Sequence, residues 1–243
     1  MSKLLLIILK SKIREPLEFF WNLFFPLAIF ATLNFSKSDN NINLTNYYQK
    51  LIPFLTWMTI QNAIYSVGLN LLNWREMGFL KSIINTSKSY FNLIILFCIC
   101  ELIMSTFYFI AIYLFSSFIL KVSLNSIDFI LLYLGFFIAN VLTSYGSTIL
   151  NTLNFSYSSI SSLISMLILP MVWLGNQNIN LQENYFFSLI NYLNPIYYLK
   201  YLILIFSNKI ITADLSIIFF SIAFLLLGSI GVLYGITTSK LRR

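Results

Sequence analysis

Six long apolar stretches make up most of this chain, and no segment between them is large enough for a soluble domain. A helix rises ~1.5 Å per residue, so about 20 apolar residues cross the ~30 Å of hydrocarbon in a bilayer. Inside lipid the backbone must satisfy its own hydrogen bonds, and helices do this. The sequence therefore predicts an all-α membrane protein with six transmembrane helices, at 17–35, 48–72, 90–119, 129–153, 159–174 and 215–237.

The composition agrees with a single membrane domain over residues 1–243. Hydrophobic residues make up 58% of the chain and charged residues 9%, whereas a typical soluble domain carries about 25% charged residues. The net charge is +7, but the cationic residues gather at the ends of the apolar stretches and form no stripe on a soluble face. We therefore expect the lipid bilayer, and not nucleic acid, as the partner of this surface.

The distribution of charge predicts that both termini lie in the cytoplasm. With six alternating spans, ten of the 15 Lys and Arg residues fall on the inner side, as the positive-inside rule requires. Residues 1–15 are basic and apolar, and we expect an interfacial helix at the inner membrane surface. Residues 185–206 are also apolar, but Pro195 and Lys200 interrupt them. They predict an outer re-entrant or interfacial hairpin before the last span.

Two of the apolar stretches carry polar side chains at spacings of three and four residues, which put each set on one helix face. Such a face either lines a solute path or hydrogen-bonds a neighbouring helix. Both uses stay open for the second stretch, and helix–helix bonding is favoured for the fourth. The two sets are Thr59, Asn62, Ser66, Asn70 and Asn73, and Asn140, Ser144, Ser147, Asn151 and Asn154.

Glu101 lies near mid-depth of the third stretch, where a charge costs at least ~2.5–3.5 kcal/mol. No Lys or Arg lies deep in another predicted span. We therefore expect Glu101 to be protonated, or to bond to Asn, Ser or Tyr neighbours. It is either a proton or cation site or a satisfied interior acid.

Residues for catalysis and for metal binding are scarce. The chain has no His, so it lacks the usual general base and the commonest metal ligand. Cys98 and Cys100 lie two residues apart in one predicted helix and cannot pair with each other. No glycine-rich phosphate loop occurs. We expect no catalytic residue, no metal and no cofactor in this chain.

The loop after the second stretch combines charges with an apolar side. It reads Trp74-Arg-Glu-Met-Gly-Phe-Leu-Lys81. A short helix of this kind, held between two spans, suits docking into a groove of a soluble partner. An ordinary positive-inside loop is the alternative. The candidate docking residues are Arg75, Glu76, Met77, Gly78, Phe79 and Lys81.

Four segments, in this order, resemble the membrane-spanning permease of type-2 ATP-binding-cassette (ABC) exporters, and the resemblance covers nearly the whole chain. The segments are Lys12-Ile-Arg-Glu-Pro16 followed by Phe20-Trp21 and Phe25-Pro26, then Asn73-Trp-Arg-Glu-Met-Gly78, then Leu169-Pro170 with Trp173-Leu-Gly175, and Leu193-Asn-Pro-Ile-Tyr197. The chain departs from the pattern at Ser87, where the family often has proline, and it lacks the usual glycine at the start of the third span.

The resemblance implies a permease subunit that exports a hydrophobic or amphipathic substrate (a drug, a peptide or a lipid-like molecule) by alternating access. Two separate ABC ATPase subunits would bind ATP and Mg and hydrolyse the ATP, so this chain is not itself an enzyme. Segment 75–81 would be the coupling helix. A second permease copy, identical or related, would complete the complex in a bacterial plasma membrane.

In this family the second and fifth spans line the substrate path, which favours Thr59, Asn62, Ser66 and Asn70 as path residues. Two other functions compete with the exporter permease. One is an ion-coupled carrier or channel that uses Glu101, and the other is a membrane scaffold that transports nothing.

Overall fold

The structure, a computed structural model, describes residues 2–14, 16–35, 44–80, 87–122, 125–176, 194–207 and 215–240, and this part of the chain is helical apart from short turns. The helices are α1 (Ser2–Arg14), α2 (Pro16–Phe35), α3 (Leu44–Asn62), α4 (Asn70–Glu76), α6 (Ser87–Leu120), α7 (Ser126–Ser147), α8 (Tyr157–Asn176), α10 (Pro195–Phe206) and α11 (Leu215–Lys240). A π-helical segment η1 (Ala63–Leu69) joins α3 to α4, and a 3₁₀ segment η2 (Thr148–Thr152) extends α7.

Four helical stretches in the described residues are long and apolar enough to cross a membrane: Tyr90–Leu120, Ser126–Thr152, Tyr157–Gly175 and Leu215–Gly235. Asn22–Asn34 in α2 and Pro195–Phe206 are shorter apolar stretches. The prediction of an all-α chain with apolar, membrane-length helices is confirmed. Helices α2 and α3–η1–α4 coincide with the first and second predicted stretches.

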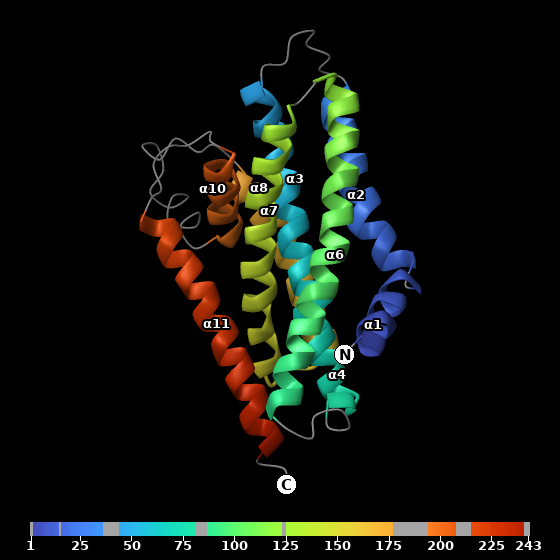
Figure 1. The fold of residues 1–243 in the computed structure, drawn as a ribbon, viewed down its shortest axis with the longest axis vertical. Helices are drawn as coiled ribbons and strands as arrows, with labels where there is room; N and C mark the ends of the chain where they lie inside the picture. The colour runs from blue at the N-terminus through green and yellow to red at the C-terminus, as the bar shows by residue number, and fades with distance from the viewer. Residues whose placement is uncertain are drawn as a thin grey trace.

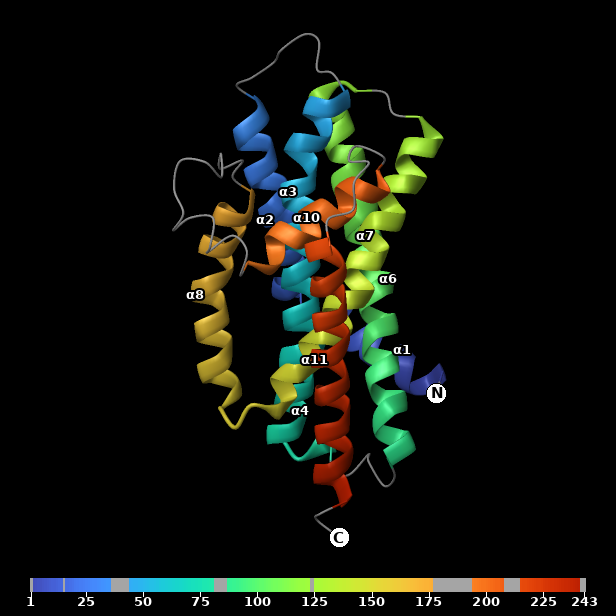
Figure 2. The same ribbon diagram turned by 90° about the vertical axis from the view of Figure 1, so that its left-hand side faces the viewer.

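The helices form an elongated bundle in which α3, α6 and α7 lie in the middle (Figure 1). Helices α1 and α2 lie on one side of this centre, and α11 lies on the other. Figure 2 shows α8 at the edge of the bundle and α10 tilted across its upper part. The largest buried cluster gathers on α3, α6, α7 and α10 and includes Leu51, Leu55, Phe109, Phe136 and Leu199.

The second predicted stretch is one rod with a π-helical segment in its middle. At Gly68 in this segment, an added Cβ would lie 2.7 Å from the carbonyl oxygen of Ser147. Only a residue without a side chain therefore allows η1 to approach α7 and η2 this closely. Single-turn π segments within helices are frequent at functional sites. Gly231 of α11 makes a similar close approach to the backbone of Thr148, as small residues do between membrane helices.

Helices α8 and α11 are packed on little of their surface. Met166 of α8 is 79% exposed and Phe219 of α11 is 69% exposed, and many of their apolar neighbours are exposed as well. In water such faces would be unfavourable, whereas in a bilayer they contact lipid or another membrane helix.

The predicted outer hairpin lies partly outside the described residues, which resume at Asn194. The Asn194 side chain accepts a hydrogen bond from the backbone N–H of Ile196 at 3.1 Å, and Pro195 follows at the first helical position. Both features begin a helix. The Asn194 Nδ2 also donates to the Met171 carbonyl at 2.7 Å. The third and fourth segments of the ABC resemblance thus meet where α10 packs against α8.

Candidate functional site

Helix α4 ends in a tight turn at the lower end of the bundle (Figure 1). The N–H of Gly78 donates to the Arg75 carbonyl at 3.1 Å, and Gly78 has a φ of 74°. This left-handed backbone favours glycine, because a Cβ there would crowd the following carbonyl oxygen. Met77 and Phe79, on either side of Gly78, are 61% and 54% exposed. The charge distribution predicts that this turn lies on the inner side of the membrane, and we call residues 74–80 the inner turn.

Arg75 holds a second turn at the same end of the bundle. Its guanidinium donates to the carbonyl oxygens of Asn151 and Leu153, the latter at 2.8 Å, and to that of Phe155 at 3.4 Å. These carbonyls belong to the connection between η2 and α8. Arg75 therefore ties the inner turn to this connection and is not free to point into solvent.

Glu76 caps helix α8. Its Oε1 accepts a hydrogen bond from the backbone N–H of Tyr157, the first residue of α8, at 2.6 Å. The first N–H groups of a helix have no partner within the helix, and a carboxylate there also complements the helix dipole. The predicted docking residues thus divide into two groups. Arg75 and Glu76 bind the chain itself, whereas Met77 and Phe79 are exposed; Lys81 lies outside the described residues.

A cavity of about 320 Å³ lies between α2, the α3–η1 rod and α8. Its polar lining forms two hydrogen-bonded pairs, with Gln61 Nε2 donating to Asn22 Oδ1 at 2.9 Å and the Tyr65 hydroxyl 2.7 Å from the hydroxyl of Ser165. The other lining residues are Phe25, Trp57, Ile168 and Leu169.

Trp57 lines the cavity and has a buried hydrogen-bond donor that is unused. Trp57 is 5% exposed, and its buried Nε1 has no hydrogen-bond partner in the described part of the chain. The Phe25 ring lies at 87° to the Trp57 ring, with centroids 5.5 Å apart. An aromatic wall with a few polar groups can hold a neutral, drug-sized molecule.

A serine-rich face runs along α8 to this cavity. Ser158, Ser162 and Ser165 are exposed and lie four and three residues apart, so they share one face of the helix. Ser162 donates to the Ser158 carbonyl and Ser165 donates to the Ser161 carbonyl. A row of hydroxyls on a membrane helix faces a polar environment more favourably than lipid tails. The row begins one residue after Tyr157, which Glu76 caps.

The structure turns the predicted path residues away from this cavity. Thr59, Asn62 and Ser66 are buried, Asn70 is half-buried, and none of them lines the cavity. Thr59 and Asn70 bond to carbonyls of their own rod. The cavity is lined instead by Trp57, Gln61 and Tyr65, a set spaced by four residues that could have been recognised as a second face. In the fourth stretch, the Asn151 Nδ2 donates to the Tyr90 hydroxyl of α6 at 2.7 Å, a bond between helices.

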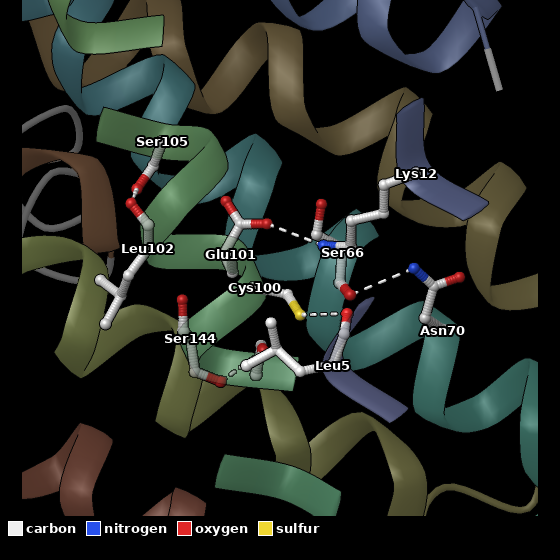
Figure 3. Close-up of polar contacts among 10 residues, drawn as sticks. Leu5, Lys12, Ser66, Asn70, Cys100, Glu101, Leu102, Ser105 and Ser144 are labelled. Carbon is white, nitrogen blue, oxygen red and sulfur yellow. Dashed lines mark hydrogen bonds and ion pairs between the residues drawn. The ribbon is translucent and has the colours of Figure 1, made fainter. Parts of the chain in front are cut away.

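Glu101 has a cationic partner, and the expectation that none would reach it is wrong. Lys12 Nζ of α1 lies 3.1 Å from Glu101 Oε2 (Figure 3). The two side chains are 8% and 0% exposed. Glu101 lies about 21 Å along α6 from Ser87 at ~1.5 Å per residue, so Lys12 reaches into the bundle. Sequence reasoning missed the pair because α1 was placed flat on the membrane surface.

Helix α1 is packed against α6 beside this pair. Ile8 is 2% exposed and belongs to a buried cluster with Leu93 and Phe97. The Cys100 thiol lies 3.8 Å from the Leu5 carbonyl oxygen, which Figure 3 also shows. Both cysteines are free thiols. No group of three or more acidic, His or Cys side chains that could hold a metal occurs in the described residues.

Comparison with known proteins does not identify the chain. No family model, no curated protein and no solved structure matches it.

Proposed function

We propose that this chain is the membrane-spanning permease subunit of an ABC exporter with the type-2 arrangement. In this proposal its six spans are the stretches at 17–35, 48–72, 90–119, 129–153, 159–174 and 215–237, both termini lie in the cytoplasm, and the membrane is a bacterial plasma membrane. Two ATPase subunits bind and hydrolyse ATP, and a second permease copy completes the complex.

The observation that carries the proposal is the connection from the inner turn to the cavity. Met77 and Phe79 offer an exposed apolar contact at one end of the bundle. Glu76, which directly precedes Met77, is bonded to the first residue of α8. The same helix contributes Ser165, Ile168 and Leu169 to the cavity wall. A force applied to the inner turn therefore acts directly on a helix that lines the cavity.

The proposed substrate class follows from the cavity lining. The lining has aromatic and aliphatic side chains, two neutral hydrogen-bonded pairs and no charged side chain. This environment favours a neutral or amphipathic solute, because a highly charged molecule would lose its hydration without gaining an ion pair. The serine row of α8 provides a polar approach from the end of the bundle where the inner turn lies.

Two alternatives to export are less well supported. An ion-coupled carrier needs Glu101 to exchange a cation, yet Lys12 already neutralises this carboxylate. A scaffold that transports nothing would need neither a solute cavity nor a hydrogen bond that ties an exposed contact surface to a cavity-lining helix.

Co-purification tests the proposal. The chain is extracted in a gentle detergent from its native membrane, and the complex is analysed by mass spectrometry. We expect a subunit with a nucleotide-binding P-loop to be recovered. The complex is then reconstituted in vesicles and supplied with ATP and a panel of amphipathic dyes and peptides. Recovery of the chain without any ATPase, or solute flux without ATP, contradicts the proposal.

The contact surface can be tested with a matched pair of variants. Phe79→Ser removes an apolar side chain from the inner turn, and Phe118→Ser removes one that is 81% exposed near the opposite end of α6. We expect only Phe79→Ser to lose the ATPase subunit during purification. Equal retention of the ATPase by both variants excludes the inner turn as the contact.

A further inference from the structure

The buried charge pair between α1 and α6 leaves hydrogen-bonding capacity unused. An ammonium has three N–H donors, and a carboxylate accepts hydrogen bonds on both oxygens. Among the described residues Lys12 donates only to Glu101 Oε2, and Glu101 Oε1 has no partner. A buried pair is favourable only where its remaining donors and acceptors are also satisfied. Glu101 Oε1 is therefore a buried acceptor without a donor in this part of the chain.

Besides Trp57 Nε1 and Asn151 Oδ1, atoms of three further interior side chains have no hydrogen-bond partner among the described residues. These are both amide atoms of Asn62, Oδ1 of Asn140 and Oγ of Ser144. Each of the three residues is at most 1% exposed. Unpaired buried polar atoms are rare in proteins and are costly in a bilayer. Together with Glu101 they contribute four oxygen atoms that have no hydrogen-bond partner among the described residues.

The register between α6 and α7 brings Glu101 to the level of Asn140. The Thr106 and Tyr133 hydroxyls lie 3.0 Å apart, and the two helices run in opposite directions (Figure 1). Glu101 comes five residues before Thr106, so it lies opposite a residue about five positions after Tyr133. Asn140 is seven positions after Tyr133, on the same helix turn.

The register between the α3–η1 rod and α7 brings Asn62 to this level as well. Gly68 contacts Ser147, and the two helices run in the same direction (Figure 1). Asn62 comes six residues before Gly68, so it lies opposite a residue about six positions before Ser147. That position falls between Asn140 and Ser144.

The four unpaired oxygen atoms could together bind a cation with one positive charge. Glu101 supplies a single carboxylate, Asn62 and Asn140 supply neutral amide oxygens, and Ser144 supplies a hydroxyl. Hard oxygen ligands of this kind bind alkali and alkaline-earth cations. One carboxylate balances the charge of a monovalent ion, whereas a divalent ion would keep an uncompensated charge in a medium of low dielectric constant. Figure 3 shows that the Lys12 ammonium reaches Glu101 from α1, with Ser144 in the same region.

We propose that Glu101, Asn62, Asn140 and Ser144 form a binding site for one monovalent cation, and that the Lys12 ammonium, bound to Glu101 Oε2, replaces this cation as the counter-ion of the carboxylate. While α1 is docked, the protein carries its own counter-ion and needs no metal ion. When Lys12 is absent, an alkali metal ion takes its place beside the carboxylate. Docking of α1 on α6 then supplies the counter-ion of Glu101.

The test uses the purified full chain and measures its thermal unfolding in sodium, potassium or choline chloride at equal ionic strength. Lys12→Met removes the charge and keeps the length of the side chain, and Lys10→Met on the exposed face of α1 is the matched control. We expect sodium or potassium to raise the Tm of Lys12→Met by several degrees, saturably, relative to choline. The wild type and Lys10→Met should show the same Tm in all three salts.

Two further variants test whether the change in Tm depends on the Glu101 charge and on the size of the added cation. Adding Glu101→Gln to Lys12→Met should abolish the salt preference, because the negative charge is lost. Lys12→Ala should regain stability with propylammonium, a free monovalent amine, and not with the bulkier tetrapropylammonium. A folded Lys12→Met with equal Tm in all three salts overturns the proposal. Failure of both Lys12 variants to fold with any added cation overturns it as well. These readouts need no ATPase and no transport, so they are independent of the proposed function.

Discussion

The Glu76 carboxylate accepts a hydrogen bond from the backbone N–H of Tyr157 at 2.6 Å, across 81 positions of the chain. The bond joins the end of one long helical rod to the start of another helix. Arg75, the neighbouring residue, binds carbonyls of the connection that leads to Tyr157. The inner turn and the start of α8 are therefore fastened at two adjacent points. If the inner turn receives force from an ATPase, this junction is where the force passes into the membrane.

Removing the cap should uncouple ATP hydrolysis from transport. A helix cap contributes ~0.5–2 kcal/mol, and one or two kcal/mol changes an equilibrium by a factor of about 5–30. We expect Glu76→Ala to reduce the transport per ATP hydrolysed by a factor in this range, while hydrolysis continues. The ratio is measured in vesicles that contain the permease and its ATPase.

Glu76→Gln is the matched control for that experiment. Its side-chain carbonyl still accepts a hydrogen bond but does not carry the charge that complements the helix dipole. Transport by Glu76→Gln should lie between that of the wild type and Glu76→Ala. If both variants transport like the wild type and remain in the membrane, the Glu76–Tyr157 bond has no part in coupling.

The backbone at Gly78 gives a second prediction. Its φ of 74° costs an ordinary residue roughly 1–2 kcal/mol, and asparagine less. Nothing lies within 4 Å of an added Cβ, so a substitution acts through backbone strain and not through a clash. We expect Gly78→Val to weaken binding of the ATPase about tenfold and Gly78→Asn to leave it near the wild-type value, measured by titration of the ATPase onto permease in nanodiscs. Equal losses in both variants contradict this.

The helices could be predicted from hydrophobicity, because in lipid the backbone N–H and C=O groups of each span must hydrogen-bond to each other. The ends of α6, predicted at 90 and 119, lie at Ser87 and Leu120. It is harder to predict which face of a span lines a cavity. In the rod α3–η1, the residues Thr59, Asn62 and Ser66 form the more polar stripe, yet Trp57 and Gln61 line the cavity.

The reason is that amphipathic side chains such as Trp, Gln and Tyr are as suitable for a solute cavity as small polar ones are, and small polar ones also bond to neighbouring helices. The Lys12–Glu101 pair was missed for a different reason. It joins positions 89 residues apart, and its cation comes from a helix that a surface placement keeps out of the bundle. The packing of α1 on α6, with Ile8 in the shared buried cluster, brings Lys12 inward.

Trp57, a cavity-lining residue whose buried Nε1 has no partner among the described residues, gives a third prediction. Trp57→Phe keeps an aromatic ring beside Phe25 and removes the Nε1 donor. A hydrogen bond contributes ~0.5–1.5 kcal/mol net, and 1.4 kcal/mol corresponds to a factor of ten in affinity. For substrates with a carbonyl acceptor, the concentration that half-saturates substrate-stimulated ATPase activity should rise about two- to tenfold. Trp173→Phe, on the exposed side of α8, should leave this concentration unchanged. The same rise in both variants removes Trp57 from the binding site.

The Lys12–Glu101 pair gives a fourth prediction, a double-mutant cycle on stability. Removing one partner of a buried pair leaves an uncompensated charge and costs ~3–5 kcal/mol, whereas replacing both partners by apolar residues costs much less. In choline chloride, Lys12→Met and Glu101→Leu should therefore each lower the free energy of unfolding by more than the double variant does. The free energies are measured by equilibrium unfolding in mixed micelles of dodecyl maltoside and dodecyl sulfate. Additive losses would show that the two side chains act independently. In sodium or potassium chloride the loss for Lys12→Met alone should shrink, because a metal ion replaces the missing ammonium, while the loss for Glu101→Leu should stay the same.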